Sequence, residues 1–147
     1  MRNILFLCTG NSARSILAET YMNHQGAGQW SAFSAGSKPV GTPNPFALKT
    51  LKNHGMAAPN ASSKSWNIFA NEDAPLMSVI VTVCDNAAGE TCPVWPTIDG
   101  GTPQIRHWSF PDPAAATGSE EVILAQFETV FKDIRTRIDA LIAEYDP

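Results

Sequence analysis

The chain has few charged residues and no excess of positive charge. Its 10 Lys and Arg residues stand against 14 Asp and Glu, and charged residues make up 16% of the 147 positions. An acidic surface without a basic cluster does not attract nucleic acids or anionic membranes, because both are polyanions. Neither is therefore expected as a partner.

Long hydrophobic runs are also absent. The apolar run at the N-terminus ends at Cys8 after five residues, whereas a membrane span needs about 20 residues and a signal peptide has a longer apolar core. We therefore expect a cytoplasmic protein. Its cysteines are few, namely Cys8, Cys84 and Cys92, and thiols in that reducing compartment are more often catalytic or metal-bound than joined in structural disulfides.

Short apolar runs alternate with amphipathic stretches along the chain. This alternation predicts an α/β fold with a parallel sheet and right-handed crossovers, whose ligands bind beyond the carboxyl ends of the strands. We expect a single domain spanning residues 1–147. The expected strands are residues 3–8, 31–35 and 76–83, and the expected helices are 15–24, 45–54, 62–70 and a long C-terminal helix with a capping box of Thr117 and Glu120 and an apolar face from Ile123 to Tyr145.

The residues that follow the first strand form a loop suited to a tetrahedral oxyanion. Cys8 ends the strand and Arg14 stands at the start of a helix, in a C-x5-R-S pattern. Successive N–H groups of a Gly-containing loop form an anion nest, the helix N-terminus adds positive potential, and Arg14 can bind two oxygens. The same surroundings favour the thiolate form of Cys8, the nucleophile. In the structural alternative, Cys8 is a buried strand-end residue and Arg14 caps a loop. The predicted oxyanion-binding residues are Thr9, Gly10, Asn11, Ser12, Ala13, Arg14 and Ser15.

Four separated blocks give the chain a specific resemblance. The loop with its continuation SILAE, SAGSKP at 34–39, VTVCDNAAGETCPVWP at 81–96 and HWSFPDPA at 107–114 resemble the low-molecular-weight tyrosine phosphatase fold and, within it, the thiol-coupled arsenate reductases. The resemblance implies a three-layer sandwich with a central parallel sheet of about four strands flanked by helices. It also implies a monomeric enzyme that reduces arsenate to arsenite without a tightly bound cofactor, with phosphate and sulfate as substrate analogues and weak phosphatase activity.

The number of cysteines distinguishes a reductase from a phosphatase. A phosphatase needs one cysteine, whereas reduction of As(V) to As(III) takes two electrons, which a pair of thiols supplies by forming a disulfide. By resemblance, Cys8 attacks arsenate, Cys84 attacks the Cys8–arsenic adduct and releases arsenite, and Cys92 then attacks the Cys8–Cys84 disulfide. In the alternative interpretation, which each cysteine would favour if considered alone, Cys84 is a small core residue at a strand end and Cys92 is a loop thiol without a function.

The segment between Cys84 and Cys92 must bend for such a relay. In one helix their Cα atoms would lie about 12 Å apart, whereas a disulfide tolerates about 7 Å, so we expect a mobile loop within the Pro- and Gly-rich region that extends to Pro113. Seven residues separate Cys84 from Cys92, one more than in the best-known thioredoxin-coupled members of the family that the chain resembles. The expected external reductant is thioredoxin or glutathione with glutaredoxin, and in the second case one of the later cysteines is less important.

Three further residues are expected near the loop. By resemblance Asp112 matches the family's general acid, which protonates the leaving oxygen; alternatively it is an ordinary Asp-Pro turn residue. Asn11 is expected to buttress the loop, with Ser37 as its partner. The histidines are scattered without ligand spacing, so no metal is expected, and the tryptophans are expected to anchor the core or loops.

Two other functions share the cysteine loop. A low-molecular-weight phosphatase acting on phosphotyrosine needs only Cys8, Arg14 and Asp112, but phosphatases of this fold usually carry an aromatic residue after the Asp-Pro pair, where this chain has Ala114. A phosphoryl carrier, like the phosphocysteine domains of sugar-transport systems, has no use for the two later cysteines, so their substitution would leave its function intact.

Overall fold

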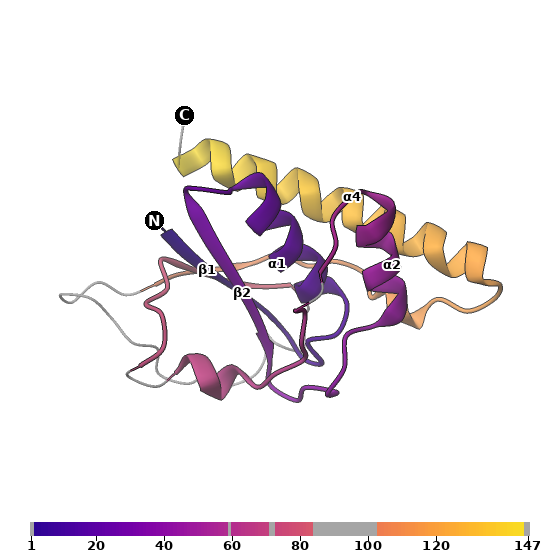
Figure 1. The fold of residues 1–147 in the computed structure, drawn as a ribbon, viewed down its shortest axis with the longest axis horizontal. Helices are drawn as coiled ribbons and strands as arrows, with labels where there is room; N and C mark the ends of the chain where they lie inside the picture. Colours follow the sequence, from indigo (N-terminus) through magenta and orange to yellow (C-terminus); the bar gives the residue numbers. More distant parts are fainter. Residues whose placement is uncertain (1, 59, 71–72, 84–102, 146–147) are drawn as a thin grey trace.

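The computed structural model describes residues 2–58, 60–70, 73–83 and 103–145. Strands and helices alternate along the first half of the chain, and a long helix closes it (Figure 1). The elements are β1 (Arg2–Cys8), α1 (Arg14–Gln25), β2 (Trp30–Gly36), α2 (Pro45–Asn53), the 3-10 helix η1 (Trp66–Phe69), β3 (Val79–Thr82), β4 (Gln104–His107), the 3-10 helix η2 (Pro113–Ala115) and α4 (Glu120–Tyr145).

Four parallel strands form the sheet, in the order β2-β1-β3-β4. The strand β1 is buried from Ile4 to Cys8, as its uninterrupted apolar run predicts for a strand covered on both faces. Cys8 pairs with Gly36 at the end of β2, and β3 ends at Thr82, opposite Leu7. The carboxyl ends of these strands therefore meet at one edge of the sheet, where the sequence predicts a ligand.

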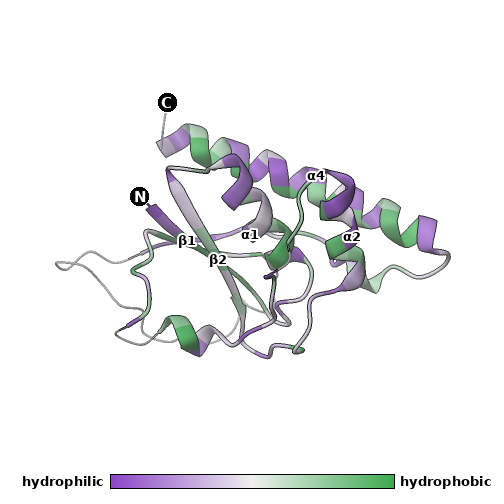
Figure 2. Cartoon of the chain, in the orientation of Figure 1, coloured by the Kyte–Doolittle hydropathy of each residue, from purple (hydrophilic) through white to green (hydrophobic). Residues whose placement is uncertain are grey.

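The helices α1, α2 and α4 lie over one face of the sheet (Figure 1). Apolar and polar residues alternate along α4 (Figure 2), so that one side of this helix can be buried. On the opposite face a smaller apolar cluster joins Leu5, Leu7 and Ile80 to Met77 and to Phe69 of η1. The predicted parallel sheet flanked by helices is confirmed, and in the described residues the second face carries the short η1.

The long helix α4 has the buried stripe that the sequence predicts, but it begins later than expected. Its predicted capping residue, Thr117, is wrong: Ser119 accepts a hydrogen bond from Val122 N–H at 3.3 Å, and the helix starts at Glu120. Gly118 has a φ of 119°, which no α-helix admits, so the helix cannot extend back to Thr117. None of the described helices is both long and apolar enough to cross a membrane. The buried residues of α4 are Phe127, Val130, Phe131, Ile134, Ile138 and Leu141.

Two other segments differ from their prediction because tertiary contacts decide them. Residues 62–70 contain η1 in place of the predicted α-helix, because the backbone of Lys64 is bonded elsewhere. Its N–H donates to Asn11 Oδ1 and its C=O accepts from Gly36 N–H, each at 2.9 Å. Residues 104–107, predicted as loop, form β4, whose mostly exposed side chains lack the apolar run of a buried strand.

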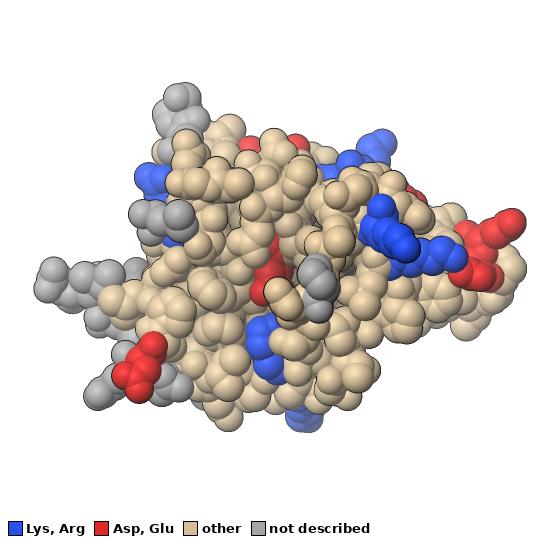
Figure 3. All heavy atoms as spheres, viewed as in Figure 1, with Lys and Arg blue, Asp and Glu red and all other residues tan. Residues whose placement is uncertain are grey.

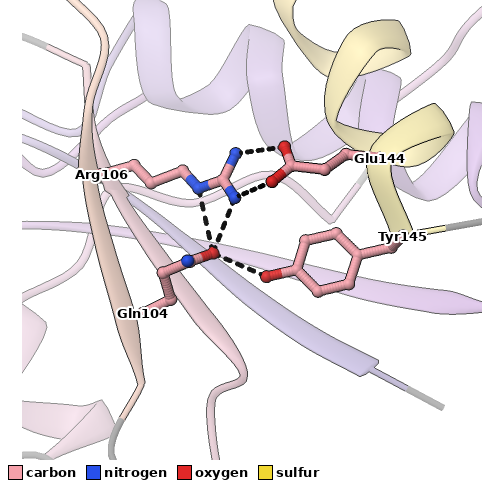
Figure 4. A network of polar contacts seen from close by, with 4 residues as sticks. All are labelled: Gln104, Arg106, Glu144 and Tyr145. Carbon is pink, nitrogen blue, oxygen red and sulfur yellow. Dashed lines mark hydrogen bonds and ion pairs between the residues drawn. The ribbon is translucent and has the colours of Figure 1, made fainter.

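The end of α4 is joined to β4 by a polar cluster (Figure 4). Arg106 donates two hydrogen bonds to Glu144, at 2.6 and 2.7 Å, and Gln104 Oε1 accepts from both Arg106 and the Tyr145 hydroxyl. The hydrogen bond to Arg106 lowers the pKa of Glu144. Exposed ion pairs contribute little to stability, so we assign the attachment of α4 mainly to its buried apolar stripe.

Replacing a buried residue of this stripe tests that assignment. Ile138 is fully buried, so Ile138→Ala should lower the free energy of unfolding by about 2–4 kcal/mol. Val122→Ala is the control, because Val122 lies in the same helix but is 51% exposed, and it should change that free energy by less than about 0.5 kcal/mol. Urea unfolding monitored by circular dichroism measures the free energy of unfolding of both variants, and equal losses of this free energy would contradict the assignment.

Candidate active site

The anion loop, residues 8–15, leads from the end of β1 into the first turn of α1. Cys8 is 5% exposed, at the carboxyl edge of the sheet. Ala13 occupies the N-cap position of α1 and offers no side-chain acceptor to the first turn, which also contains no acidic residue. No side chain of these residues therefore neutralises the donors and the positive potential of the helix N-terminus, an arrangement that suits an anion.

Asn11 holds the loop in shape from within. It is fully buried and adopts a φ of 47°, in the left-handed region that few residues other than glycine occupy. Its Nδ2 donates to Ser15 Oγ at 2.8 Å and to Ser34 Oγ at 3.0 Å, and its Oδ1 accepts from Lys64 N–H at 2.9 Å. The predicted buttress is present, but Ser37 is the wrong partner: its buried hydroxyl has no hydrogen-bond partner in the part of the chain that the structure describes.

Behind Asn11 the contacts continue to a carboxyl group that sequence reasoning missed. Ser34 Oγ donates to Glu19 Oε2 at 2.8 Å. Burial raises the pKa of Glu19, while the positive charge of Lys64 and the hydrogen bond from Ser34 partly offset that effect. Burial also lowers the pKa of Lys64, against the opposing influence of Glu19. The available signal was an acidic residue inside the apolar helix run SILAE, four residues after Ser15 and thus on its face.

Arg14 connects the anion loop to the loop that carries Asp112. Its Nη1 donates to Phe110 C=O at 2.8 Å, and its Nη2 lies 3.9 Å from Asp112 Oδ2. Asp112 itself caps η2, because its Oδ1 accepts from Ala114 N–H at 3.0 Å. The structure thus brings together the predicted cation and the predicted acid. Among the described residues, the buried Arg14 Nε has no hydrogen-bond partner.

The Asp112 loop is held in place by buried aromatic residues. Trp108 packs against Phe6 of β1, with ring centroids 6.2 Å apart, and against Phe110 at 6.5 Å. Both Trp108 and Phe110 are buried, which agrees with the predicted role of Trp108 as an anchor. This packing sets the position of the Phe110 carbonyl that Arg14 binds.

The other two predicted redox residues, Cys84 and Cys92, lie outside the described residues, as does the predicted bend between them. The described chain reaches Val83, whose N–H donates to Leu7 C=O at 2.8 Å beside β1. Within the described ranges, no three His, Cys, Asp or Glu side chains gather as metal ligands.

Gly36 provides a test of how closely the loop packs on β2. A Cβ at this position would collide with the Thr9 carbonyl oxygen and lie 2.8 Å from that of Cys8. Gly36→Ala should therefore cost about 1–3 kcal/mol of stability, as overpacking does, and weaken phosphate binding. Gly10→Ala is the control, since its Cβ would meet the side chain of Val40 at 3.3 Å, which can move. Thermal unfolding compares the stability of the two variants, and phosphate calorimetry follows Gly36→Ala alone, because Gly10 is itself a predicted oxyanion-binding residue. A larger loss of stability from Gly10→Ala would contradict this packing.

Known proteins are similar to this chain in sequence and in fold. The family described as low molecular weight phosphotyrosine protein phosphatase matches residues 3–146. The arsenate reductase of Bacillus subtilis is 36% identical over 137 residues, which are 92% of this chain and 91% of that protein. The arsenate reductase of Staphylococcus aureus is 33% identical over 138 residues, 94% of each chain.

Solved structures of the same kinds of protein have a similar fold. A structure described as an arsenate reductase in the reduced state has a TM-score of 0.75 at 26% identity and covers 98% of both chains. A tyrosine phosphatase of Erwinia amylovora shares the fold, with a TM-score of 0.73 at 17% identity over 97% of this chain and 92% of that one. The resemblance inferred from the four sequence blocks is confirmed. The chain therefore belongs to the low molecular weight phosphotyrosine protein phosphatase family, and it is similar to the arsenate reductases of that family.

Proposed function

We propose that this chain is an arsenate reductase that binds arsenate in the anion loop and reduces it to arsenite with its own thiols. The observation that carries the oxyanion site is the contact of Arg14 with Phe110, which brings Asp112 to 3.9 Å from the guanidinium; the choice of arsenate rests on the similarity to the arsenate reductases. A thiol beside an uncapped helix N-terminus, a cation and a carboxyl group are the parts that displace an oxygen from a tetrahedral oxyanion. The relatives in Bacillus subtilis and Staphylococcus aureus are named arsenate reductases.

In the first step the thiolate of Cys8 attacks arsenic. A sulfur–arsenic bond forms while an arsenic–oxygen bond breaks, and Asp112 gives a proton to the leaving oxygen, which departs as water. Arg14 and the N–H groups of residues 9–15 bind the remaining oxygens and stabilise their negative charge. Arsenic stays in the +5 state in this step.

The reduction takes place in the second step. The thiolate of Cys84 attacks the sulfur of Cys8, a disulfide forms, and the electron pair of the sulfur–arsenic bond remains on arsenic, which leaves as arsenite. Cys92 then attacks the sulfur of Cys84 and displaces Cys8 as a thiolate, leaving a Cys84–Cys92 disulfide. Two thiols lose the two electrons that arsenic gains. These roles rest on the number of thiols and on the family resemblance.

An external thiol must reduce the final disulfide, and we propose thioredoxin or glutathione with glutaredoxin for this role. No tightly bound cofactor is needed, because the cysteines carry the electrons. We further propose that the enzyme acts as a monomer in the cytoplasm, where such reductants are present.

A phosphatase reaction on phosphotyrosine is the second candidate. The family match over residues 3–146 favours it, since Cys8, Arg14 and Asp112 suffice to form and hydrolyse a thiophosphate. We propose this reaction as a weak side activity, because hydrolysis of a phosphate ester transfers no electrons and therefore gives Cys84 and Cys92 no role.

Arsenite release tests the relay. Wild type and Cys92→Ser are supplied with arsenate and with either thioredoxin, thioredoxin reductase and NADPH or glutathione and glutaredoxin. We expect turnover with thioredoxin in the wild type and its loss in Cys92→Ser. Turnover with glutaredoxin alone would keep the reductase and remove the relay, and strong phosphatase activity without any arsenite would contradict the proposal.

Hydrolysis of p-nitrophenyl phosphate tests the acid. Asp112→Asn should lower kcat by about 100-fold, because the leaving oxygen loses its proton donor. Asp133→Asn serves as the control, since Asp133 is an exposed carboxylate of α4, and should leave kcat unchanged. If Asp112→Asn retained full activity, Asp112 would not be the acid.

A further inference from the structure

Three carbonyl oxygens of the anion loop are bonded by a neighbouring segment. This flanking segment, residues 37–44, connects the end of β2 to α2 and lies along one side of the loop. The three bonds run from Lys38 N–H to Thr9 C=O at 2.9 Å, from Val40 N–H to Gly10 C=O at 3.1 Å and from Asn44 N–H to Ser12 C=O at 2.8 Å.

These bonds also set the direction of the loop's N–H groups. A trans peptide is planar, so its C=O and the N–H that follows point in opposite directions. A carbonyl turned toward the flanking segment therefore turns the next N–H toward the other side of the loop. The sequence of the flanking segment suits this arrangement, since Pro39, which has no N–H, falls between the two donors Lys38 and Val40.

Ser63 reinforces one of these peptides from a distant part of the chain. Its hydroxyl donates to Gly10 C=O at 2.9 Å and accepts from Gly41 N–H at 3.2 Å. With Val40 as the other donor, both acceptor sites of the Gly10 oxygen are used. One hydroxyl thus joins the anion loop to the flanking segment.

The residue after Ser63 holds the next residue of the loop. Lys64 N–H donates to Asn11 Oδ1, so two successive residues bind two successive residues of the anion loop. Val40, the remaining donor to Gly10, is 65% exposed and bonds at the longer distance of 3.1 Å. Of the two donors to the Gly10 carbonyl, Ser63 is therefore the nearer one.

We propose that Ser63 is a positioning residue for oxyanion binding. It acts through the Gly10–Asn11 peptide, which it holds in the orientation that the loaded loop requires. The proposal rests on the proposed function only in so far as the loop binds an oxyanion, and it applies equally to arsenate and phosphate. Without the hydroxyl, Val40 N–H alone bonds the Gly10 carbonyl, so this peptide is less restrained and part of the binding free energy is spent on ordering it.

Calorimetric titration of the reduced full chain with inorganic phosphate tests the proposal without any need for turnover. Ser63→Ala should bind phosphate about fivefold more weakly, the effect of one neutral hydrogen bond. Ser63→Thr keeps the hydroxyl and should bind within about twofold of the wild type. Ser62→Ala changes an exposed neighbouring hydroxyl and should leave the affinity unchanged.

A loss of stability alone does not produce this pattern, since each titration is made well below the unfolding temperature of its variant. Equal affinities for Ser63→Ala and the wild type would overturn the role of Ser63, as would an equal loss in Ser62→Ala or no rescue in Ser63→Thr. If Ser63→Ala does not fold, Ser63→Cys replaces it, and its weaker donor should give a smaller loss in the same direction. A wild type that binds neither phosphate nor arsenate would overturn the proposed function itself.

Discussion

The carbonyl oxygens of the anion loop must turn away from the space that an oxyanion would fill, and hydrogen bonds from outside the loop supply that constraint. A short loop cannot satisfy these carbonyls itself while all its N–H groups converge on one ligand. The flanking segment and Ser63 bind them instead. The left-handed backbone of Asn11 and the bare Cα of Gly36 follow from the same requirement, because the loop packs directly on the end of β2.

The sheet brings the parts of the site together. Parallel strands place their carboxyl ends at one edge, so the loop after β1 and the loop after β4 face each other although about a hundred residues separate them. Arg14 spans the two loops. Beyond Asn11, burial raises the pKa of Glu19 and lowers the pKa of Lys64, and each charge partly offsets the shift of the other group. The space-filling view shows acidic and basic atoms close together in the middle of the face turned to the viewer (Figure 3), in contrast to the mostly uncharged surface around them.

The parts that depend on local pattern were predictable from sequence. Local sequence is enough to recognise three features: the apolar run of β1, the periodic apolar stripe of α4 and the spacing of Cys8 and Arg14. The parts that depend on partners were not. Ser34, not Ser37, binds Asn11, because the last residues of β2 lie beside the loop and only the sheet register decides which hydroxyl reaches it. Likewise β4 is defined by its pairing with β3 rather than by its own largely exposed residues.

We propose that the thiols of this chain are the source of the electrons that reduce arsenate. The most direct measurement is a single turnover: fully reduced protein is mixed with arsenate without any external reductant, and arsenite and remaining thiols are counted. If the thiols supply the electrons, each chain forms one arsenite and loses two thiols. Arsenate binding with no arsenite formed and no thiol lost, in a protein that still hydrolyses phosphate esters, would contradict it.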